Sequence, residues 1–118
     1  MTRIKDTDLR QERDRALYRA YNEAILHNDF ASQKEAFDYV RTHPAPKFYI
    51  SAEFCAIVIG RMRAGKDMGV CGEQRIRKFQ ELYRRYKVER AKPENFELST
   101  QDICNIIVDQ EAPEFYLN

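Results

Sequence analysis

Residues 32–51 read SQKEAFDYVRTHPAPKFYIS, and residues 99–118 read STQDICNIIVDQEAPEFYLN, an ungapped match at a constant offset of 67. Five of the twenty aligned positions are identical, including an Ala-Pro pair and a Phe-Tyr pair in each copy. Further upstream, LYRAY at 17–21 recurs as LYRRY at 82–86. Because two separate motifs recur in the same order, the sequence predicts a degenerate internal repeat.

Each copy has the pattern of a helix, a capped second helix and an extended segment; we call the extended segments strap 1 (44–50) and strap 2 (111–117). Ser32 with Glu35, and Ser99 with Asp102, have the spacing of a capping box, in which each side chain bonds the other residue's backbone N–H. Proline disfavours helix in the residue before it, so the two capped helices should end near positions 43 and 110. The straps follow, and their aromatic residues should act mainly as core pegs. These residues are Phe48, Tyr49, Phe115 and Tyr116.

The segment after strap 1 predicts a central helix. Ser51 is a suitable N-cap, and every residue from 54 to 59 is apolar or small, which is typical of a helix buried on all sides. A short buried strand is the alternative for this run. Either one central helix serves both repeats or the natural chain continues past Asn118, and we favour the shared helix.

The fold class follows from these elements. The four glycines lie within 60–72 and suggest a hinge, after which a helix should run from about Glu73 to Arg90. We predict a single all-α domain over 1–118 with about five helices around the central apolar helix. Repeat 1 would cover about 8–64 and repeat 2 about 73–118.

Composition limits the kind of protein. The chain has 118 residues, 43% of them hydrophobic, and a formal net charge of +1, which is ordinary globular composition. No window has the apolar length of a membrane span, and the start of the sequence lacks the apolar core of a secretory signal. Three widely spaced cysteines argue against a disulfide framework, so we expect a cytoplasmic protein without a membrane partner.

Charge is unevenly distributed along the chain. Residues 60–92 carry eleven basic and four acidic side chains, whereas residues 93–118 carry six acidic and no basic ones. The helix near 73–90 would therefore present a basic face suited to phosphate contacts. Its candidate nucleic-acid-binding residues are Arg75, Arg77, Lys78, Arg84, Arg85 and Lys87. The alternative, given equal weight, is that the acidic tail folds back onto this helix.

Catalysis is not expected. The stretch 60–66 resembles a phosphate-binding loop, but Asp67 occupies the position of the metal-binding hydroxyl, so nucleotide binding there is disfavoured. Cysteine and histidine spacings form no metal motif, and we assign no catalytic residue, metal or cofactor. The two-helix pattern is like a helix-turn-helix, yet the connection over 44–50 is longer than that motif's turn.

The repeated A-P-x-F-Y and L-Y-R-x-Y motifs resemble those of small uncharacterised proteins of gut bacteria, their phages and mobile elements. The resemblance covers 17–51 and 82–118 and implies no established activity. The leading interpretation is a non-catalytic accessory protein that binds DNA or RNA mainly through phosphates. The alternative is a protein-interaction or structural subunit of a phage or mobile-element assembly, which binds itself or another protein through the 111–118 tail.

Overall fold

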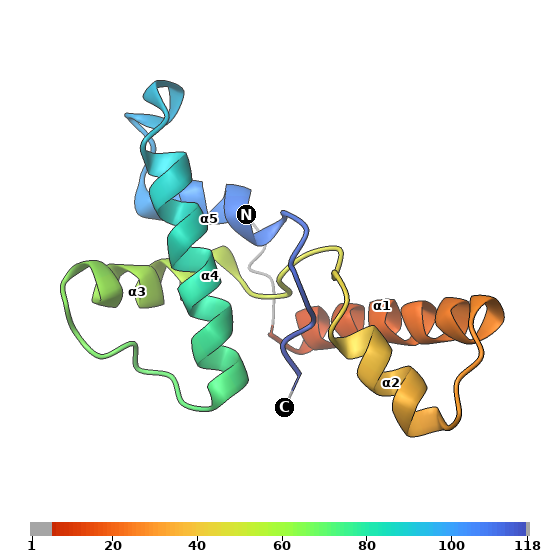
Figure 1. Cartoon of the computed structure of the whole chain (residues 1–118). Helices are drawn as coiled ribbons and strands as arrows, with labels where there is room; N and C mark the ends of the chain where they lie inside the picture. The colour runs from red at the N-terminus through yellow and green to blue at the C-terminus, as the bar shows by residue number, and fades with distance from the viewer. Residues whose placement is uncertain (1–5, 118) are drawn as a thin grey trace.

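Five α-helices and one 3-10 turn account for the regular structure of the computed structural model, which describes residues 6–117 (Figure 1). The elements are α1 (Asp6–His27), α2 (Gln33–Arg41), α3 (Ala52–Arg63), α4 (Glu73–Arg90), η1 (Pro93–Asn95) and α5 (Thr100–Val108). The described residues contain no strand, only a single antiparallel bridge. The all-α prediction is confirmed, and the predicted bounds of α4 are those observed. None of the described helices is both long and apolar enough to cross a membrane.

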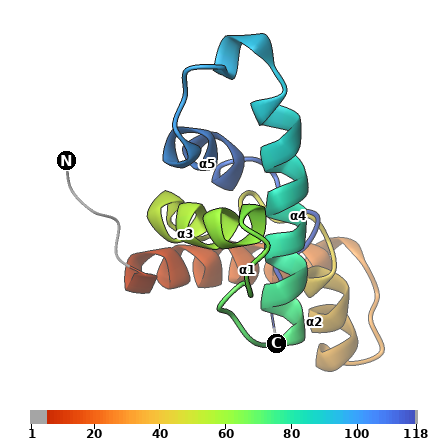
Figure 2. The same cartoon turned by 90° about the vertical axis from the view of Figure 1, so that its left-hand side faces the viewer.

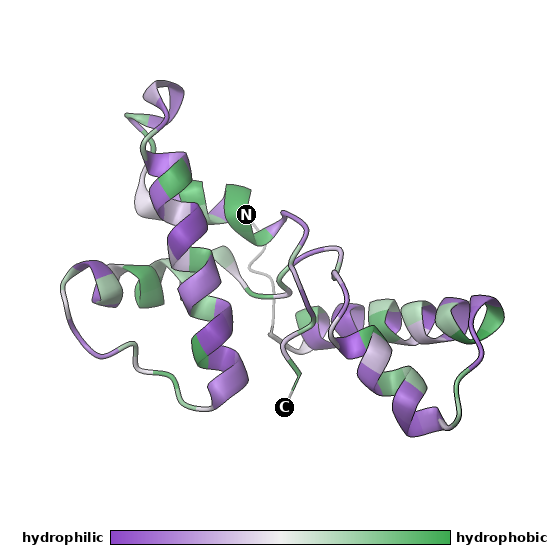
Figure 3. Ribbon diagram, in the orientation of Figure 1, coloured by the Kyte–Doolittle hydropathy of each residue, from purple (hydrophilic) through white to green (hydrophobic). Residues whose placement is uncertain are grey.

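The helices form two groups that are joined by the straps. Helices α3, α4 and α5 pack on one another, and α1 packs against α2 as a hairpin to one side (Figures 1 and 2). The chain is elongated as a result, with extents of 50 × 29 × 27 Å. Hydrophobic residues are frequent along α3 and α5, whereas α4 is mostly hydrophilic with a few hydrophobic bands (Figure 3). The straps thus lie where the two groups meet.

The two capped helices differ in one detail from the predicted capping boxes. In α5, Ser99 Oγ accepts from the Asp102 N–H and Asp102 accepts from the Ser99 N–H, as predicted. In α2, Ser32 accepts from the Glu35 N–H, but the Glu35 carboxylate accepts from the N–H of Ala31 instead. Glutamate is one methylene longer than aspartate, so it reaches one residue further back.

Both capped helices end two residues before the predicted positions, at Arg41 and Val108. In α2, the Thr42 hydroxyl donates to the Asp38 and Tyr39 carbonyls at 3.0 and 3.1 Å, and the His43 ring contacts the same Tyr39 carbonyl. These side chains satisfy the last carbonyls of the helix, so the backbone can leave it before the proline.

Helix α3 differs from the predicted central helix. Ser51 caps it as predicted, and Cys55, Val58 and Ile59 are buried against the α4–α5 pair. Ile57, however, is 60% exposed, so the helix is buried on one side only. Its packing partners are α4 and α5, and a helix shared equally by both repeats is not confirmed.

The predicted glycine hinge is shorter than 60–72. Gly60 lies inside α3, which continues to Arg63, so the connection to α4 begins after that residue. Gly65, Gly69 and Gly72 have φ values of 72°, 77° and 95°, a region that glycine enters without steric cost. These three residues make the turn, and α3 leaves no loop at 60–63 to surround a phosphate.

The two straps bind each other reciprocally. The Ala45 N–H donates to the Ala112 carbonyl and the Ala112 N–H to the Ala45 carbonyl, both at 2.9 Å. The Phe48 N–H donates to the Val108 carbonyl at 3.1 Å, and Phe115 donates to Arg41 at 3.3 Å. These four bonds form two pairs. Within a pair, the donor residues are 67 positions apart and so are the acceptor residues, because the two repeats exchange roles. The strap contacts therefore obey the sequence offset, and the remainder of the internal repeat stays a prediction.

The strap aromatics follow the same rule. Phe48 stacks on Tyr116 and Phe115 stacks on Tyr49, with centroid distances of 6.2 and 6.4 Å. Both phenylalanines are buried, as predicted for core pegs, whereas both tyrosines are half-buried. Both tyrosines have a φ of 56°, which is uncommon for a bulky residue and carries strain that the neighbouring contacts must hold. Each strap thus fixes the tyrosine of the other.

Candidate anion-binding site

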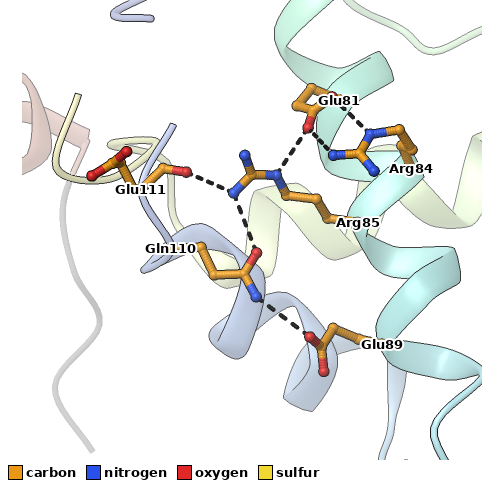
Figure 4. Close-up of polar contacts among 6 residues, drawn as sticks. All are labelled: Glu81, Arg84, Arg85, Glu89, Gln110 and Glu111. Carbon is orange, nitrogen blue, oxygen red and sulfur yellow. Dashed lines mark hydrogen bonds and ion pairs between the residues drawn. The ribbon is translucent and has the colours of Figure 1, made fainter. Parts of the chain in front are cut away.

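Three of the six predicted basic residues of α4 bind other groups of the same chain. Arg84 binds the Glu81 carboxylate with two nitrogens at 3.1 and 2.6 Å, and Arg85 Nε binds the same carboxylate at 3.0 Å (Figure 4). The hydrogen bond and charge of Arg84, with those of Arg85, lower the pKa of Glu81, so this carboxylate is ionised at neutral pH. Glu81 therefore neutralises part of this basic face.

The acidic tail folds back onto α4. Arg77 binds Glu114 with two nitrogens at 2.8 and 3.3 Å, and its guanidinium lies over the Tyr116 ring. Arg85 Nη1 donates to the Glu111 carbonyl at 2.7 Å and to Gln110, as Figure 4 shows. The predicted folding of the acidic tail onto this helix is therefore observed, and binding of an external anion by the same helix stays a prediction.

The other three predicted residues have no carboxylate partner among the described residues. Lys87 is exposed and lies over the Tyr83 ring with its Nζ 4.8 Å from the centroid. Arg75 lies over the Phe54 ring at 5.8 Å, and Lys78 is half-buried one turn further along the helix. The Glu81 carboxylate therefore pairs with Arg84 and Arg85 but with neither Arg75 nor Lys78.

A cavity of about 530 Å³ brings Arg75 and Lys78 together with two arginines of α1. Arg10 and Arg13 line it from α1, and both straps, α2 and α3 contribute the remaining walls. Arg13 is also bound to Asp14, at 3.0 and 3.2 Å, but Asp14 does not line the cavity. No aspartate or glutamate is among its described lining residues, so four cations face one space without a lining counter-charge.

Lys78 is the most perturbed of these cations. Burial, followed by the charges of Arg13 and Arg75, lowers the pKa of Lys78 from 10.5 to about 8. Within residues 6–117 its ammonium makes no hydrogen bond or ion pair, although it is still protonated at neutral pH. A desolvated cation beside like charges costs free energy that a bound anion would recover.

Two strap tyrosines complete the lining. Tyr49 and Tyr116 line the cavity, and burial raises the pKa of each, so both hydroxyls remain protonated donors. Phe54 and Phe79 pack edge to face at 5.7 Å and form part of the apolar wall. The lining therefore combines cations, hydroxyl donors and aromatic surface, a combination suited to an anionic ligand that carries a ring.

Sequence reasoning missed Arg10 and Arg13. Residues 1–31 contain six basic and six acidic side chains, so no excess charge marks the two arginines. Their spacing of three residues places them on one helix face, but nothing in the sequence indicates that this face meets α4 across the straps. Only the tertiary structure reveals the cluster.

The thiols suggest no chemistry at this site. Cys55 of α3 and Cys104 of α5 are fully buried free thiols, and the contact with Cys104 together with burial raises the pKa of Cys55. Cys71 is exposed in the loop before α4. The buried pair is a packing contact between two helices.

The comparisons with known proteins bring no relative: no family model, curated protein or solved structure matches this chain.

Proposed function

We propose that this chain is a non-catalytic nucleic-acid-binding protein that holds its ligand mainly through phosphates. The observation that supports this most directly is the convergence of Arg10, Arg13, Arg75 and Lys78 on one cavity without a described carboxylate in its lining. Arginine and lysine on helices are the usual partners of nucleic-acid phosphates. Two of the four, Arg75 and Lys78, come from the basic helix that the sequence singled out.

The other predicted α4 residues receive a smaller role in this proposal. Arg77, Arg84 and Arg85 already bind carboxylates or carbonyls of the protein, so a phosphate would have to displace those partners. Lys87 has no such partner among the described residues and adds a peripheral contact. We therefore expect the cavity cations to dominate the affinity.

Fluorescence polarisation with a labelled single-stranded oligonucleotide tests the proposal. Binding should weaken steeply with salt, with a log–log slope of about −3 if four phosphates are neutralised. Arg75→Ala and Arg10→Ala should each weaken binding about tenfold, the loss expected for one charge-assisted contact. The matched control is Arg84→Ala, which removes an arginine of the same helix that Glu81 already neutralises, and it should change affinity less than about twofold.

One result would reject this function, and another would reject the cavity as its site. One is the absence of binding even at low salt. The other is equal loss of affinity in Arg84→Ala and Arg75→Ala, which would mean that net charge rather than the cavity governs binding.

A second candidate function, protein interaction, is favoured by an apolar groove between α1 and α2. The groove has a volume of about 490 Å³, and its apolar and aromatic lining residues are Leu17, Tyr18, Tyr21 and Phe37. Tyr18 is 68% exposed and Phe37 is 38% exposed. Such a surface on a helix pair is typical of a site that accepts another helix.

The sequence offsets indicate what would fill this groove. Leu17, Tyr21 and Phe37 align with Leu82, Tyr86 and Cys104. Those three counterparts are buried in the core that α4 and α5 share with α3. By analogy, the α1–α2 groove fits an apolar helix with small or β-branched residues at the spacing of Cys55, Val58 and Ile59.

A labelled peptide of residues 51–66 tests this second function when it is added to the full chain. Anisotropy should rise on binding, and Phe37→Asp in the protein should abolish the rise. Ile57→Asp is the matched protein control, because Ile57 is exposed outside the groove. If a peptide carrying Val58→Asp and Ile59→Asp binds equally well, the groove does not recognise a helix of this kind.

A further inference from the structure

The polar side chains that line the cavity of Arg10, Arg13, Arg75 and Lys78 are mainly hydrogen-bond donors. Its polar side chains are the four cations and the two tyrosine hydroxyls, and both hydroxyls are neutral donors at neutral pH. Among the described residues, neither hydroxyl and neither Lys78 nor Arg10 has a hydrogen-bond partner. A ligand that supplies several acceptor oxygens at one point would satisfy all of these groups together.

The net charge of the lining favours a dianion over a monoanion. Arg13 is compensated by Asp14, which leaves Arg10, Arg75 and Lys78 without a described counter-charge. A phosphodiester of a nucleic-acid backbone carries one negative charge, whereas a terminal phosphate monoester carries about −1.5 to −2 at neutral pH. The monoester therefore matches the three uncompensated cations more closely.

The size and walls of the cavity allow more than a phosphate. A volume of about 530 Å³ lies within the range of small-molecule sites. Phe37, Phe54 and the two strap tyrosines contribute aromatic rings to its lining. Aromatic rings stack on nucleobases without strong preference for one base.

The tyrosine conformation is a further sign of a prepared site. Tyr49 and Tyr116 both hold a φ of 56°, and each is stacked on the buried phenylalanine of the other strap. Non-glycine residues in this conformation cluster at ligand sites, where surrounding contacts hold the strain. Here the stacking contacts hold two tyrosines in this conformation at the lining of the same cavity.

We propose that this cavity binds the terminal phosphate monoester of a nucleotide, with the phosphate among Arg10, Arg75 and Lys78 and the base against the aromatic wall. The nucleotide is either free or the phosphorylated end of a strand, and the chemistry is the same for both. This inference rests on the proposed nucleic-acid function only for the second source.

Two oligonucleotides that differ in one group test the inference on the full chain. One is a short single strand with a 5′-phosphate and the other is the same strand with a 5′-hydroxyl. We expect the phosphorylated strand to bind at least about tenfold more tightly, as one additional charge-assisted contact implies. Lys78→Met should remove this preference, and Arg84→Ala should retain it.

A free mononucleotide separates the two sources. Adenosine 5′-monophosphate that competes with the phosphorylated strand, while adenosine does not, supports a site that accepts the free ligand. Binding of the phosphorylated strand without competition by the mononucleotide supports a site for strand ends.

The outcomes distinguish this inference from the proposed function. Equal, salt-sensitive binding of both strands overturns the monoester inference and leaves nucleic-acid binding intact. Binding of neither strand rejects nucleic-acid binding, and absence of mononucleotide binding in the same titration then overturns the inference as well. A phosphate preference that survives Lys78→Met and Arg75→Ala together also overturns it, because the phosphate must then lie elsewhere.

Discussion

Replacing Lys78 with methionine should stabilise the protein and weaken its binding of anions. Lys78 is half-buried, carries no described counter-ion and lies beside Arg13 and Arg75. Methionine keeps most of the length of the lysine stem, so the apolar contacts of the side chain are preserved. The charge, which the folded state holds at a cost, is the part that is removed.

The magnitude follows from the pKa. The pKa of Lys78 falls from 10.5 in the unfolded chain to about 8 in the folded protein. That difference corresponds to about 3 kcal/mol at neutral pH, which is an upper bound because a half-buried site can relax and admit water. We expect a gain of about 1–2 kcal/mol in the free energy of unfolding for Lys78→Met, and a rise of several degrees in Tm.

The dependence of the free energy of unfolding on pH tests whether burying the Lys78 charge is destabilising. Between about pH 8 and 10.5 the unfolded chain holds a proton on Lys78 that the folded protein has released, so Lys78 contributes an increase of stability with pH across this window. Lys78→Met should lack this increase. Tyr49, Tyr116 and Cys55 have raised pKa values in the folded protein and lower stability with rising pH in both proteins, so the test is the difference in slope between wild type and Lys78→Met from about pH 7 to 9.5.

Urea unfolding followed by circular dichroism at both ends of that range is the assay. Lys87→Met is the matched control, because Lys87 lies on the same helix but is exposed, and it should change stability by less than about 0.5 kcal/mol. A Lys78→Met protein that is less stable than wild type near pH 7, or one with the same pH slope, would refute the reasoning.

Three further predictions concern the fold. Ser99→Ala should cost about 1 kcal/mol, because the Asp102 N–H loses its acceptor at the start of α5, and urea unfolding measures the loss. Ala112→Leu should cost about 1–3 kcal/mol, because Ala112 is 1% exposed within the strap contact; an unchanged unfolding midpoint would contradict that packing. With a thiol reagent such as Ellman's, one cysteine should react quickly in the native protein and all three after unfolding, and Cys71→Ser should remove the fast phase.

Local signals in the sequence were sufficient for the helices. The bounds of α4 followed from the glycine before it and from the period of its apolar residues, and Phe79, Leu82 and Tyr86 are buried as that period requires. Ser51 marked the start of α3 correctly because N-capping depends on a single side chain and the next turn. The reach of Glu35 was wrong by one residue, since pattern matching ignores the length of a side chain.

The candidate site depended on tertiary contacts that the sequence does not encode locally. The tail and α4 carry opposite charges, yet charge alone could not place Glu114 beside Arg77. Arg10 and Arg13 lie in a segment of balanced charge, and only the tertiary structure brings them to the cavity that Lys78 also lines. In α3 the sequence predicted too much burial. Every residue from 54 to 59 is apolar or small, so the pattern does not distinguish the buried face from the exposed Ile57.

The reciprocal straps explain why the cavity exists at all. Tyr49 is held by Phe115 and Tyr116 is held by Phe48, so neither tyrosine keeps its place without the other strap. The cations divide in the same way, since two come from α1 and two from α4, on opposite sides of the strap contact. Each strap supplies only one of the two tyrosines, and each of the two helices supplies only one pair of cations. The donor-rich cavity therefore depends on both straps, and any change that separates them should abolish anion binding before it unfolds the α3–α5 bundle.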